Sequence, residues 1–344
     1  MNWITNRILA FIGTQKFLSV QLDITNACNL NCRHCYQGAH SVDGDLSFNK
    51  WRDILDQYDA LAMKLHLKPH FCISGGEPTL SPVFENILHE LHSRWPKAEI
   101  AVLTNGTNIS ERIAATLTTH KAAVQISIEG PDAPRNDLIR GSGSFNKATE
   151  GFKKLRSAGL KTTLQAVLSN RTSPWIPEFF ALATDIGANA MNFTRFVPQG
   201  KGKTFCESGE DTPLIGPGLR DAYQMILTVS KRTGISTNTN LPLFALISPE
   251  LGAHGKFGFQ GLVVDYKGNL KVSSRADFQL GDIFQAGLEN LFLRHPLMEA
   301  LRTAKIETCG SCGLYDRCGG DRNAAYATYG SFTRKDPGCW KDAE

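Results

Sequence analysis

The pattern of apolar and polar residues changes its period at regular intervals along the chain. Residues 17–25 alternate with period two, which predicts a strand with Val20, Leu22 and Ile24 on one side. Ser47 then supplies an N-cap, and the following segment carries an apolar stripe at helical spacing. The stripe consists of Trp51, Ile54, Leu55, Tyr58, Ala62 and Leu65.

This strand-then-helix unit is followed by five more. Strands are expected at 70–74, 99–103, 123–128, 162–168 and 190–197, and helices at 81–91, 110–119, 144–159, 174–186 and 219–232. Residues 198–217 are expected to be a long loop. Six successive βα units predict a parallel sheet, here a partial (β/α)6 TIM-like barrel of the α/β class. Something must cover its open side, and the loops after the strands should carry the chemistry.

The remainder of the chain divides into three further parts. An N-terminal arm (1–16) precedes the barrel (17–235), and a connector (236–260) follows it. Residues 261–344 form a small, cysteine-rich α+β extension. We expect a hairpin in 261–272, turning at Lys267-Gly268-Asn269, and short helices at 287–293 and 296–304.

Composition excludes several classes of protein. The 344 residues are 42% hydrophobic and 20% charged, which is ordinary for a globular protein. A net charge of +4 gives no reason to expect a nucleic acid or a membrane surface as partner. The apolar run in residues 7–13 is too short for a signal peptide or a membrane span, which predicts a cytoplasmic protein. Nine cysteines in such a protein indicate metal or redox use rather than disulfides.

Three of these cysteines form a loop directly after the first predicted strand. Cys28, Cys32 and Cys35 have the spacing C-x3-C-x2-C. Thiolates are strong ligands for iron and zinc, and three of them leave one iron of a cubane [4Fe–4S] cluster without a protein ligand. An open metal position usually serves chemistry. The alternative is a zinc site closed by His34 or His40, but the spacing favours an iron–sulfur cluster.

A second motif, Gly75-Gly76-Glu77-Pro78, follows the second strand. Together the two motifs resemble the radical S-adenosylmethionine (SAM) enzymes, and the resemblance covers residues 17–235. It implies that Cys28, Cys32 and Cys35 hold the cluster and that SAM chelates the free iron. One electron, from a donor such as flavodoxin or ferredoxin, would cleave SAM to a 5′-deoxyadenosyl radical that takes a hydrogen atom from the substrate.

The resemblance also implies which residues bind SAM. Gly75 and Gly76 would let the backbone approach the methionine amino group, with Glu77 helping to neutralise it and Pro78 ending the motif. His34 occupies the usual aromatic position before the third cysteine, where the backbone meets adenine. Contacts to ribose and carboxylate are implied for Asn105, Ser127 and Arg140, with a turn residue, a capped loop and a surface arginine as the alternatives.

A second group of cysteines lies at the end of the chain. Cys309, Cys312, Cys318 and Cys339 supply four thiolates, enough to close a cluster or a zinc site. The group resembles the second auxiliary-cluster site of the SPASM extension, found in enzymes that mature peptides and sulfatases. Ser273 and Arg322 stand where that extension has cysteines of a first auxiliary cluster. The resemblance therefore implies one auxiliary [4Fe–4S] cluster with no open iron.

Residues for acid–base chemistry are not clearly marked. Ser274 stands where some SPASM enzymes have an acidic base, so a base must come from elsewhere, and Asp277 and Asp265 are candidates.

Two cysteines lie outside the groups. Cys72 is interpreted as a core cysteine of a short apolar strand. Cys206 is either an incidental loop cysteine or a thiol that returns a hydrogen atom to a substrate radical. Near it, Arg195, Lys201 and Lys203 are either solvated or meet an acidic substrate.

Three functions remain open from the sequence. The resemblance favours modification of a ribosomally made peptide by cross-linking, desaturation or epimerisation. Because the cysteine loop begins at residue 28, we expect no separate leader-binding domain before the barrel, so the peptide would bind the barrel mouth directly or through a partner protein. The second reading is a radical SAM enzyme acting on a sugar, an amino acid or a tetrapyrrole. The third is a non-catalytic two-cluster electron-transfer protein, against which the Gly-Gly-Glu-Pro turn argues.

Overall fold

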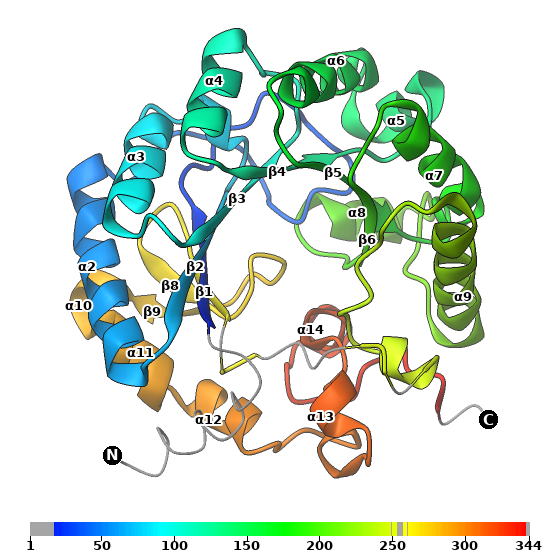
Figure 1. The fold of residues 1–344 in the computed structure, drawn as a ribbon. Helices are drawn as coiled ribbons and strands as arrows, with labels where there is room; N and C mark the ends of the chain where they lie inside the picture. Colours follow the sequence, from blue (N-terminus) through cyan, green and yellow to red (C-terminus); the bar gives the residue numbers. More distant parts are fainter. Residues whose placement is uncertain (1–16, 249, 253–256, 260, 342–344) are drawn as a thin grey trace.

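The parallel strands predicted from the sequence form a single curved sheet. A computed structural model describes residues 17–248, 250–252, 257–259 and 261–341, so the predicted N-terminal arm lies outside the described residues. The sheet has nine strands in the order β6-β5-β4-β3-β2-β1-β7-β8-β9. Strands β1 to β6 pair in parallel with their neighbours. Helices surround them on the outside, which confirms the partial (β/α)6 barrel (Figure 1).

The strands and helices of the six βα units have the following bounds. The strands are β1 Phe17–Asp23, β2 Lys68–Ser74, β3 Glu99–Thr104, β4 Ala123–Ser127, β5 Thr162–Leu168 and β6 Ala190–Arg195. The main helices are α2 Phe48–Leu65, α3 Phe84–Arg94, α4 Glu111–Thr119, α6 Ser144–Ser157, α7 Ile176–Asp185 and α9 Gly216–Thr233. Short 3-10 turns occur at η1 Pro78–Leu80, η2 Ser173–Trp175 and η3 Phe244–Leu246.

The period-two pattern of β1 separates two environments. Val20, Leu22 and Ile24 are buried in the hydrophobic core, whereas Gln21 and Asp23 alternate with them and point to the other face, inside the barrel. All six residues of the predicted stripe on α2 are buried in the same core. Burial of apolar surface thus holds helices to the outer face of the sheet and leaves its inner face for polar residues.

Two helices lie in segments expected to be loops. Helix α5 (Ala133–Arg140) begins at Asp132, whose side chain accepts a hydrogen bond from the Arg135 amide at 3.0 Å, with a proline in its first turn. Helix α8 (Lys201–Glu207) occupies the predicted loop after β6. Both are too short and too polar to show an apolar stripe, so periodicity did not reveal them.

The C-terminal extension continues the sheet past β1. The predicted hairpin is confirmed, since β7 (Gly261–Val264) pairs antiparallel with β8 (Asn269–Lys271), and β9 (Gln279–Asp282) adds a third strand. The sequence did not reveal that β7 would also pair in parallel with β1. The elements that follow are α10 Ile283–Ala286, α11 Leu288–Arg294, α12 Pro296–Arg302, η4 Cys309–Ser311, α13 Tyr315–Cys318 and α14 Arg322–Tyr329.

The end of the extension reaches back to the other edge of the barrel. In Figure 1, α13 and α14 lie in the gap between β1 and the α9 side of the barrel. A buried ion pair joins the segment after α14 to β6, because the Arg195 guanidinium donates to both oxygens of Asp336 at 2.8 and 3.1 Å. The open side of the barrel is therefore covered by the chain's own cysteine-rich extension.

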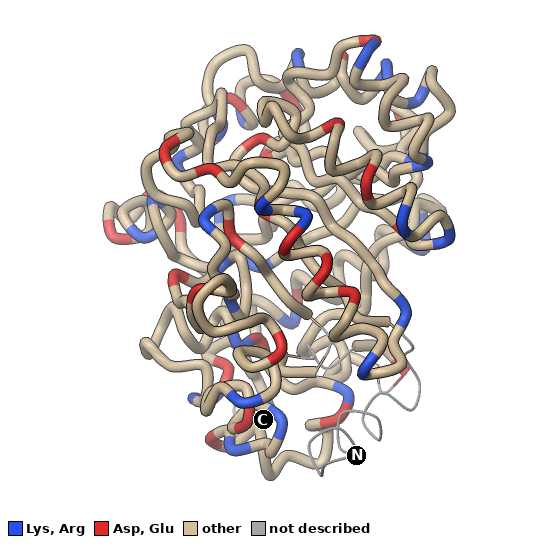
Figure 2. The backbone as a smooth tube through the Cα atoms, turned by 90° about the vertical axis from the view of Figure 1, so that its left-hand side faces the viewer, with Lys and Arg blue, Asp and Glu red and all other residues tan. Residues whose placement is uncertain are grey.

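Charged residues do not segregate along the described chain. Figure 2 shows basic and acidic positions intermingled over the backbone. Among the helices of the described residues, none is long and apolar enough to span a membrane.

Candidate active site

The cysteine loop and the glycine turn are pressed against each other. The Gly76 amide donates to the Thr25 carbonyl at 2.8 Å, and the Glu77 amide donates to the Ala27 carbonyl at 2.7 Å. A Cβ added to Gly75 would lie 2.3 Å from the Thr25 oxygen, and one added to Gly76 would lie 2.2 Å from the Ala27 oxygen. Gly75 also has a φ of +131°, which side chains rarely permit. Both glycines are therefore required for the turn to support the loop.

The two helices missed from the sequence hold the loop from other sides. The Arg33 amide donates to the Ile139 carbonyl of α5 at 2.9 Å. On α8, the Gly202 amide donates to the Cys35 carbonyl at 3.0 Å, and a Cβ on Gly202 would lie 2.9 Å from the His34 oxygen. The loop is thus fixed by backbone contacts to three separate segments.

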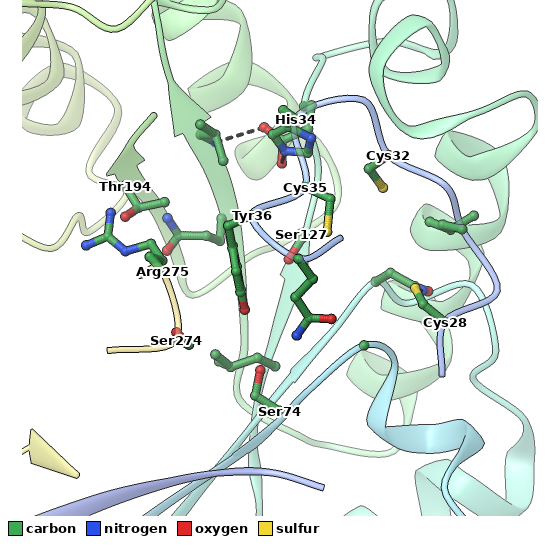
Figure 3. A pocket seen from close by; sticks show the side chains of 18 of the residues that line it. Cys28, Cys32, His34, Cys35, Tyr36, Ser74, Ser127, Thr194, Ser274 and Arg275 are labelled. Atoms are coloured by element: carbon green, nitrogen blue, oxygen red, sulfur yellow. Dashed lines mark hydrogen bonds and ion pairs between the residues drawn. The ribbon is translucent and has the colours of Figure 1, made fainter. Parts of the chain in front are cut away.

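A cavity of about 350 Å³ opens beside the loop, inside the barrel. It is lined by most of the residues singled out from the sequence, namely Cys28, Cys32, His34, Cys35, Gly75, Gly76, Asn105, Ser127 and Arg140. Figure 3 shows the three cysteines together on one side of the cavity and Thr194, Ser274 and Arg275 on the other. The structure therefore brings together candidates from the first four βα units.

The chemistry of this wall fits an iron–sulfur cluster and a polar ligand. Cys28, Cys32 and Cys35 are free thiols, and burial raises the pKa of Cys35 to about 11 and raises that of Cys28. Such thiols become thiolates only where a cation stabilises them. Arg140 is buried beside them: burial opposes its charge, but the Cys32 thiolate and Glu129 raise its pKa.

Two buried polar atoms on the cavity wall, His34 Nδ1 and Gln37 Oε1, have no hydrogen-bond partner among the described residues. Among those residues, no three Cys, His, Asp or Glu side chains converge tightly enough for a single metal ion. A cubane does not require such convergence, because each thiolate binds a different iron.

Glu77 and Pro78 lie behind the wall rather than on it. The Glu77 carboxylate is fully buried and accepts hydrogen bonds from the Thr79 hydroxyl at 2.7 Å, the Thr104 hydroxyl at 2.8 Å and the Asn105 amide at 2.7 Å. It joins the end of β2 to the end of β3. Pro78 begins the 3-10 turn η1. In this structure Glu77 holds the turn in place, and its contact with SAM stays a prediction.

His34 has a partner that the sequence did not indicate. Its Nε2 lies 3.0 Å from Glu129 Oε1, while Arg140 Nη1 lies 3.4 Å from the same oxygen. The other Glu129 oxygen accepts from the Val167 amide at 2.8 Å. Glu129 is 2% exposed and lines the cavity, so it organises the wall opposite β1. Its position in a Glu-Gly-Pro turn directly after a strand was the signal that could have found it.

Asn105 connects the wall to the cysteine loop. Its side-chain Nδ2 donates to Asn29 Oδ1 at 2.8 Å and lies 3.9 Å from Cys28 Sγ. Its own oxygen accepts from the Thr107 amide at 2.9 Å, which closes the turn after β3. Asn105 is thus both a turn residue and a part of the cavity wall.

The catalytic candidates lie away from the cavity. Cys206 is on α8, so its predicted place in a loop is wrong; it is not among the residues that line the cavity, and its role as a hydrogen-atom donor stays a prediction. Asp277 is exposed and offers only its backbone carbonyl, to the Tyr326 hydroxyl at 3.0 Å. Asp265 instead closes the hairpin turn by accepting from the Lys267 and Asn269 amides. None of these three reaches the described cavity.

The basic residues near α8 also have other roles. Arg195 is buried in the ion pair with Asp336 yet still lines the cavity, so its contact with an acidic substrate stays a prediction. Lys201 donates to Asn31 of the cysteine loop, and the exposed Lys203 is 3.9 Å from Glu207. Cys72 has the Asp23 carboxylate nearby, and burial raises its pKa to about 12.

The four C-terminal cysteines come from separate segments and converge. Gly320 is two residues after Cys318, and a Cβ added to it would lie 3.3 Å from Cys309 Sγ. Lys341, two residues after Cys339, donates to Cys312 Sγ at 3.3 Å. Cys318 and Cys339 are close enough for their charges to interact. Four free thiols at this point fit a closed cluster rather than a single zinc ion, because no three of the described Cys, His, Asp or Glu side chains converge tightly enough for one ion.

A second cavity of about 460 Å³ adjoins the first, and it is lined in part by Ser273. The two cavities share the lining residues Gln21, Thr194, Arg195, Ser274 and Arg275. None of the four C-terminal cysteines lines either cavity.

Comparison with known proteins defines the class of the chain. Residues 22–181 match the model of the radical SAM superfamily. This match includes the cysteine loop, the glycine turn and the His34–Glu129 pair. Residues 22–181 therefore form a radical SAM domain, and the chain is a radical SAM enzyme, whose cofactors are a [4Fe–4S] cluster and SAM.

Its relatives are similar over almost the whole chain. The mycofactocin maturase MftC of Mycobacterium tuberculosis is 29% identical over 95% of this chain and 84% of its own length. The AdoMet-dependent heme synthase of Methanosarcina barkeri is 26% identical over 92% of this chain and 94% of its own. Among solved structures, Streptococcus suis SuiB bound to the precursor peptide SuiA has a TM-score of 0.74 at 16% identity, covering 96% of this chain and 78% of that one. The last likeness shows that barrel and extension share a known fold.

Proposed function

We propose that this radical SAM enzyme modifies a ribosomally made peptide by cross-linking, desaturation or epimerisation. The observation that supports it most is the pair of adjoining cavities, one bearing the three thiols and the other reaching under the extension. Two similar proteins support a peptide substrate: one is named a mycofactocin maturase, and the other was solved bound to a precursor peptide.

In this proposal, Cys28, Cys32 and Cys35 hold the cluster that binds and cleaves SAM. The bound pair supplies a 5′-deoxyadenosyl radical that takes a hydrogen atom from the substrate. Arg140 offsets the negative charge of the thiolates, and the two glycines leave space for a ligand beside the loop. His34 Nδ1 and Gln37 Oε1 are available to hydrogen-bond what enters.

The inner face of the sheet suits a peptide. Three carboxamides, Gln21, Gln125 and Gln165, line the catalytic cavity from β1, β4 and β5. A carboxamide both donates and accepts, so it can pair with peptide N–H and C=O groups. Cys309, Cys312, Cys318 and Cys339 hold one auxiliary [4Fe–4S] cluster, away from the substrate. The cytoplasmic location and an electron donor such as flavodoxin or ferredoxin complete the proposal.

The similarity to heme synthases keeps a tetrapyrrole as the second candidate substrate. The anaerobically reconstituted enzyme should be given short peptides encoded next to its gene and, separately, an iron porphyrin bearing propionates. Mass spectrometry should find a peptide that has lost hydrogen, or one that gains deuterium from heavy water at an inverted centre. Turnover of the porphyrin with no effect of any peptide would overturn the peptide proposal.

A further inference from the structure

The C-terminal cysteine site contains a buried cation at a place where the SPASM pattern has a cysteine. Arg322 is the first residue of α14 and is only 2% exposed. Its Nη2 donates toward Cys309 Sγ at 3.5 Å. Arg322 therefore does more than replace a cysteine ligand, because its guanidinium points at Cys309, one of the four C-terminal cysteines.

The guanidinium is held in this direction by backbone carbonyls. Its Nε donates to Gly320 at 3.3 Å, and its Nη1 donates to Phe332 at 3.0 Å and to Arg334 at 2.6 Å. Glycine suits residue 320 because its φ is +66° and because a Cβ there would lie 2.2 Å from Arg322 Nη2, so a side chain would displace the guanidinium. The site is thus built around this side chain.

Arg322 has no carboxylate to balance its charge among the described residues that it contacts. The nearby Asp336 is already bound by both nitrogens of Arg195. Burying a cation without a counter-charge destabilises a folded protein. An iron–sulfur cluster bound by four thiolates carries net negative charge and would supply the missing counter-charge.

We infer that Arg322 raises the reduction potential of the auxiliary cluster. The inference rests on the proposed function, which places a cluster at the four C-terminal cysteines. Reduction adds negative charge to the cluster, so a fixed cation and a hydrogen bond to a ligand sulfur stabilise the reduced state more than the oxidised one. Two further donors act in the same direction, the Leu243 amide on Cys318 Sγ at 3.2 Å and Lys341 on Cys312 Sγ at 3.3 Å. Arg322 is the buried and rigid member of this set.

The test is a redox titration followed by electron paramagnetic resonance. The full-length chain with Cys28, Cys32 and Cys35 replaced by alanine isolates the auxiliary signal, and the unmodified holoenzyme is titrated beside it. In this background, Arg322→Gln should shift the equilibrium toward the oxidised cluster at least tenfold, which is about 59 mV for a one-electron couple. Arg322→Lys, which keeps the charge, should recover part of the shift.

Arg334→Gln is the matched control, because this arginine lies in the same extension, is half exposed and pairs with Glu307 at 2.6 Å. Its removal should leave the potential nearly unchanged. An unaltered potential in Arg322→Gln at full iron content would overturn the inference, as would loss of the cluster in both Arg322 variants, which would make the arginine purely structural. If the unmodified chain held no iron at the four cysteines, the proposed auxiliary cluster itself would fail.

Discussion

The two cysteine sites of this molecule are built in opposite ways. The first lies within eight residues of one loop, and its thiols line a cavity. The second gathers cysteines from a 31-residue span of the extension, and none of them lines either described cavity. A local loop can leave one side of a cluster open to a ligand, whereas four thiolates from several segments enclose one.

The two sites also differ in the contacts that hold them in place. The first is held by backbone contacts to the glycine turn, α5 and α8, and it faces buried atoms without partners. The second is held by side-chain ion pairs and receives hydrogen bonds on three of its sulfurs. The first site is therefore open to a ligand, whereas the second is closed around its thiols, as the proposed auxiliary cluster requires.

The largest effect is expected from Cys32→Ala at the first site. Removing one of three ligands should destroy the SAM-binding cluster, so 5′-deoxyadenosine formation should fall to background in an anaerobic assay. Cys206→Ala is the control, since this cysteine does not line the cavity and should leave SAM cleavage intact. Cleavage that survives in Cys32→Ala would remove the assignment of the loop.

The corresponding change at the second site should have a different result. Cys312→Ala should reduce the iron content by about half while SAM cleavage continues without product, because a cubane at each site contributes equally to the iron count. Iron and sulfide analysis and the same nucleoside assay measure both. A Cys312 variant that still forms product would contradict a functional role of the second site.

A large effect on stability is expected from the ion pair that docks the extension. Arg195→Met leaves the buried Asp336 carboxylate without its cation, with only backbone amides as partners, which should lower the free energy of unfolding by about 3–5 kcal/mol. Arg334→Gln, which removes an exposed pair, should cost less than about 1 kcal/mol in the same denaturant titration. Equal losses from both variants would show that the extension does not depend on its buried pair.

A pH effect on stability is expected at Asp23 of β1, the strand that pairs with β7 of the extension. Burial raises the pKa of this carboxyl from 3.8 to about 6, against a hydrogen bond from Gln21. The folded state therefore binds the proton more tightly, and this contribution to stability is present below pH 4 and lost as the pH rises through 6. At pH 7, Asp23→Asn should be more stable by about 3 kcal/mol, a difference that should vanish near pH 4.

The measurement for Asp23 is denaturant unfolding as a function of pH, with the exposed Asp43→Asn as control. A pH-independent difference between Asp23→Asn and the unmodified chain would show that the carboxyl titrates normally in the folded protein.

The smallest effect is expected from the glycine turn. Gly76→Ala forces a Cβ to within 2.2 Å of the Ala27 oxygen, and the resulting shift should cost about 1–3 kcal/mol of stability. It should also weaken cluster binding at the first site while sparing the second. Gly38→Ala, at a position with nothing within 4 Å of the new Cβ, should do neither.

Much of the fold followed from periodicity, and its failures have a common cause. The six strands and the main helices each carry enough buried apolar residues to show a period. Helices α5 and α8 do not, because each buries only a few residues against a neighbour far away in sequence. These same two helices clamp the cysteine loop, so the missed elements are the ones that complete the site.

The sequence alone identified the two groups of cysteine ligands, because ligand identity and spacing can be read along the chain. It also determined the barrel, because alternation and helical stripes are local. Only the tertiary structure decided that Glu129 would partner His34, that Arg195 would bind Asp336, and that Arg322 would face Cys309. Each of these contacts joins residues that are far apart in the sequence and adjacent only in the folded chain. In the buried interior a charged group interacts with whichever polar group lies beside it, and residue spacing does not reveal that neighbour.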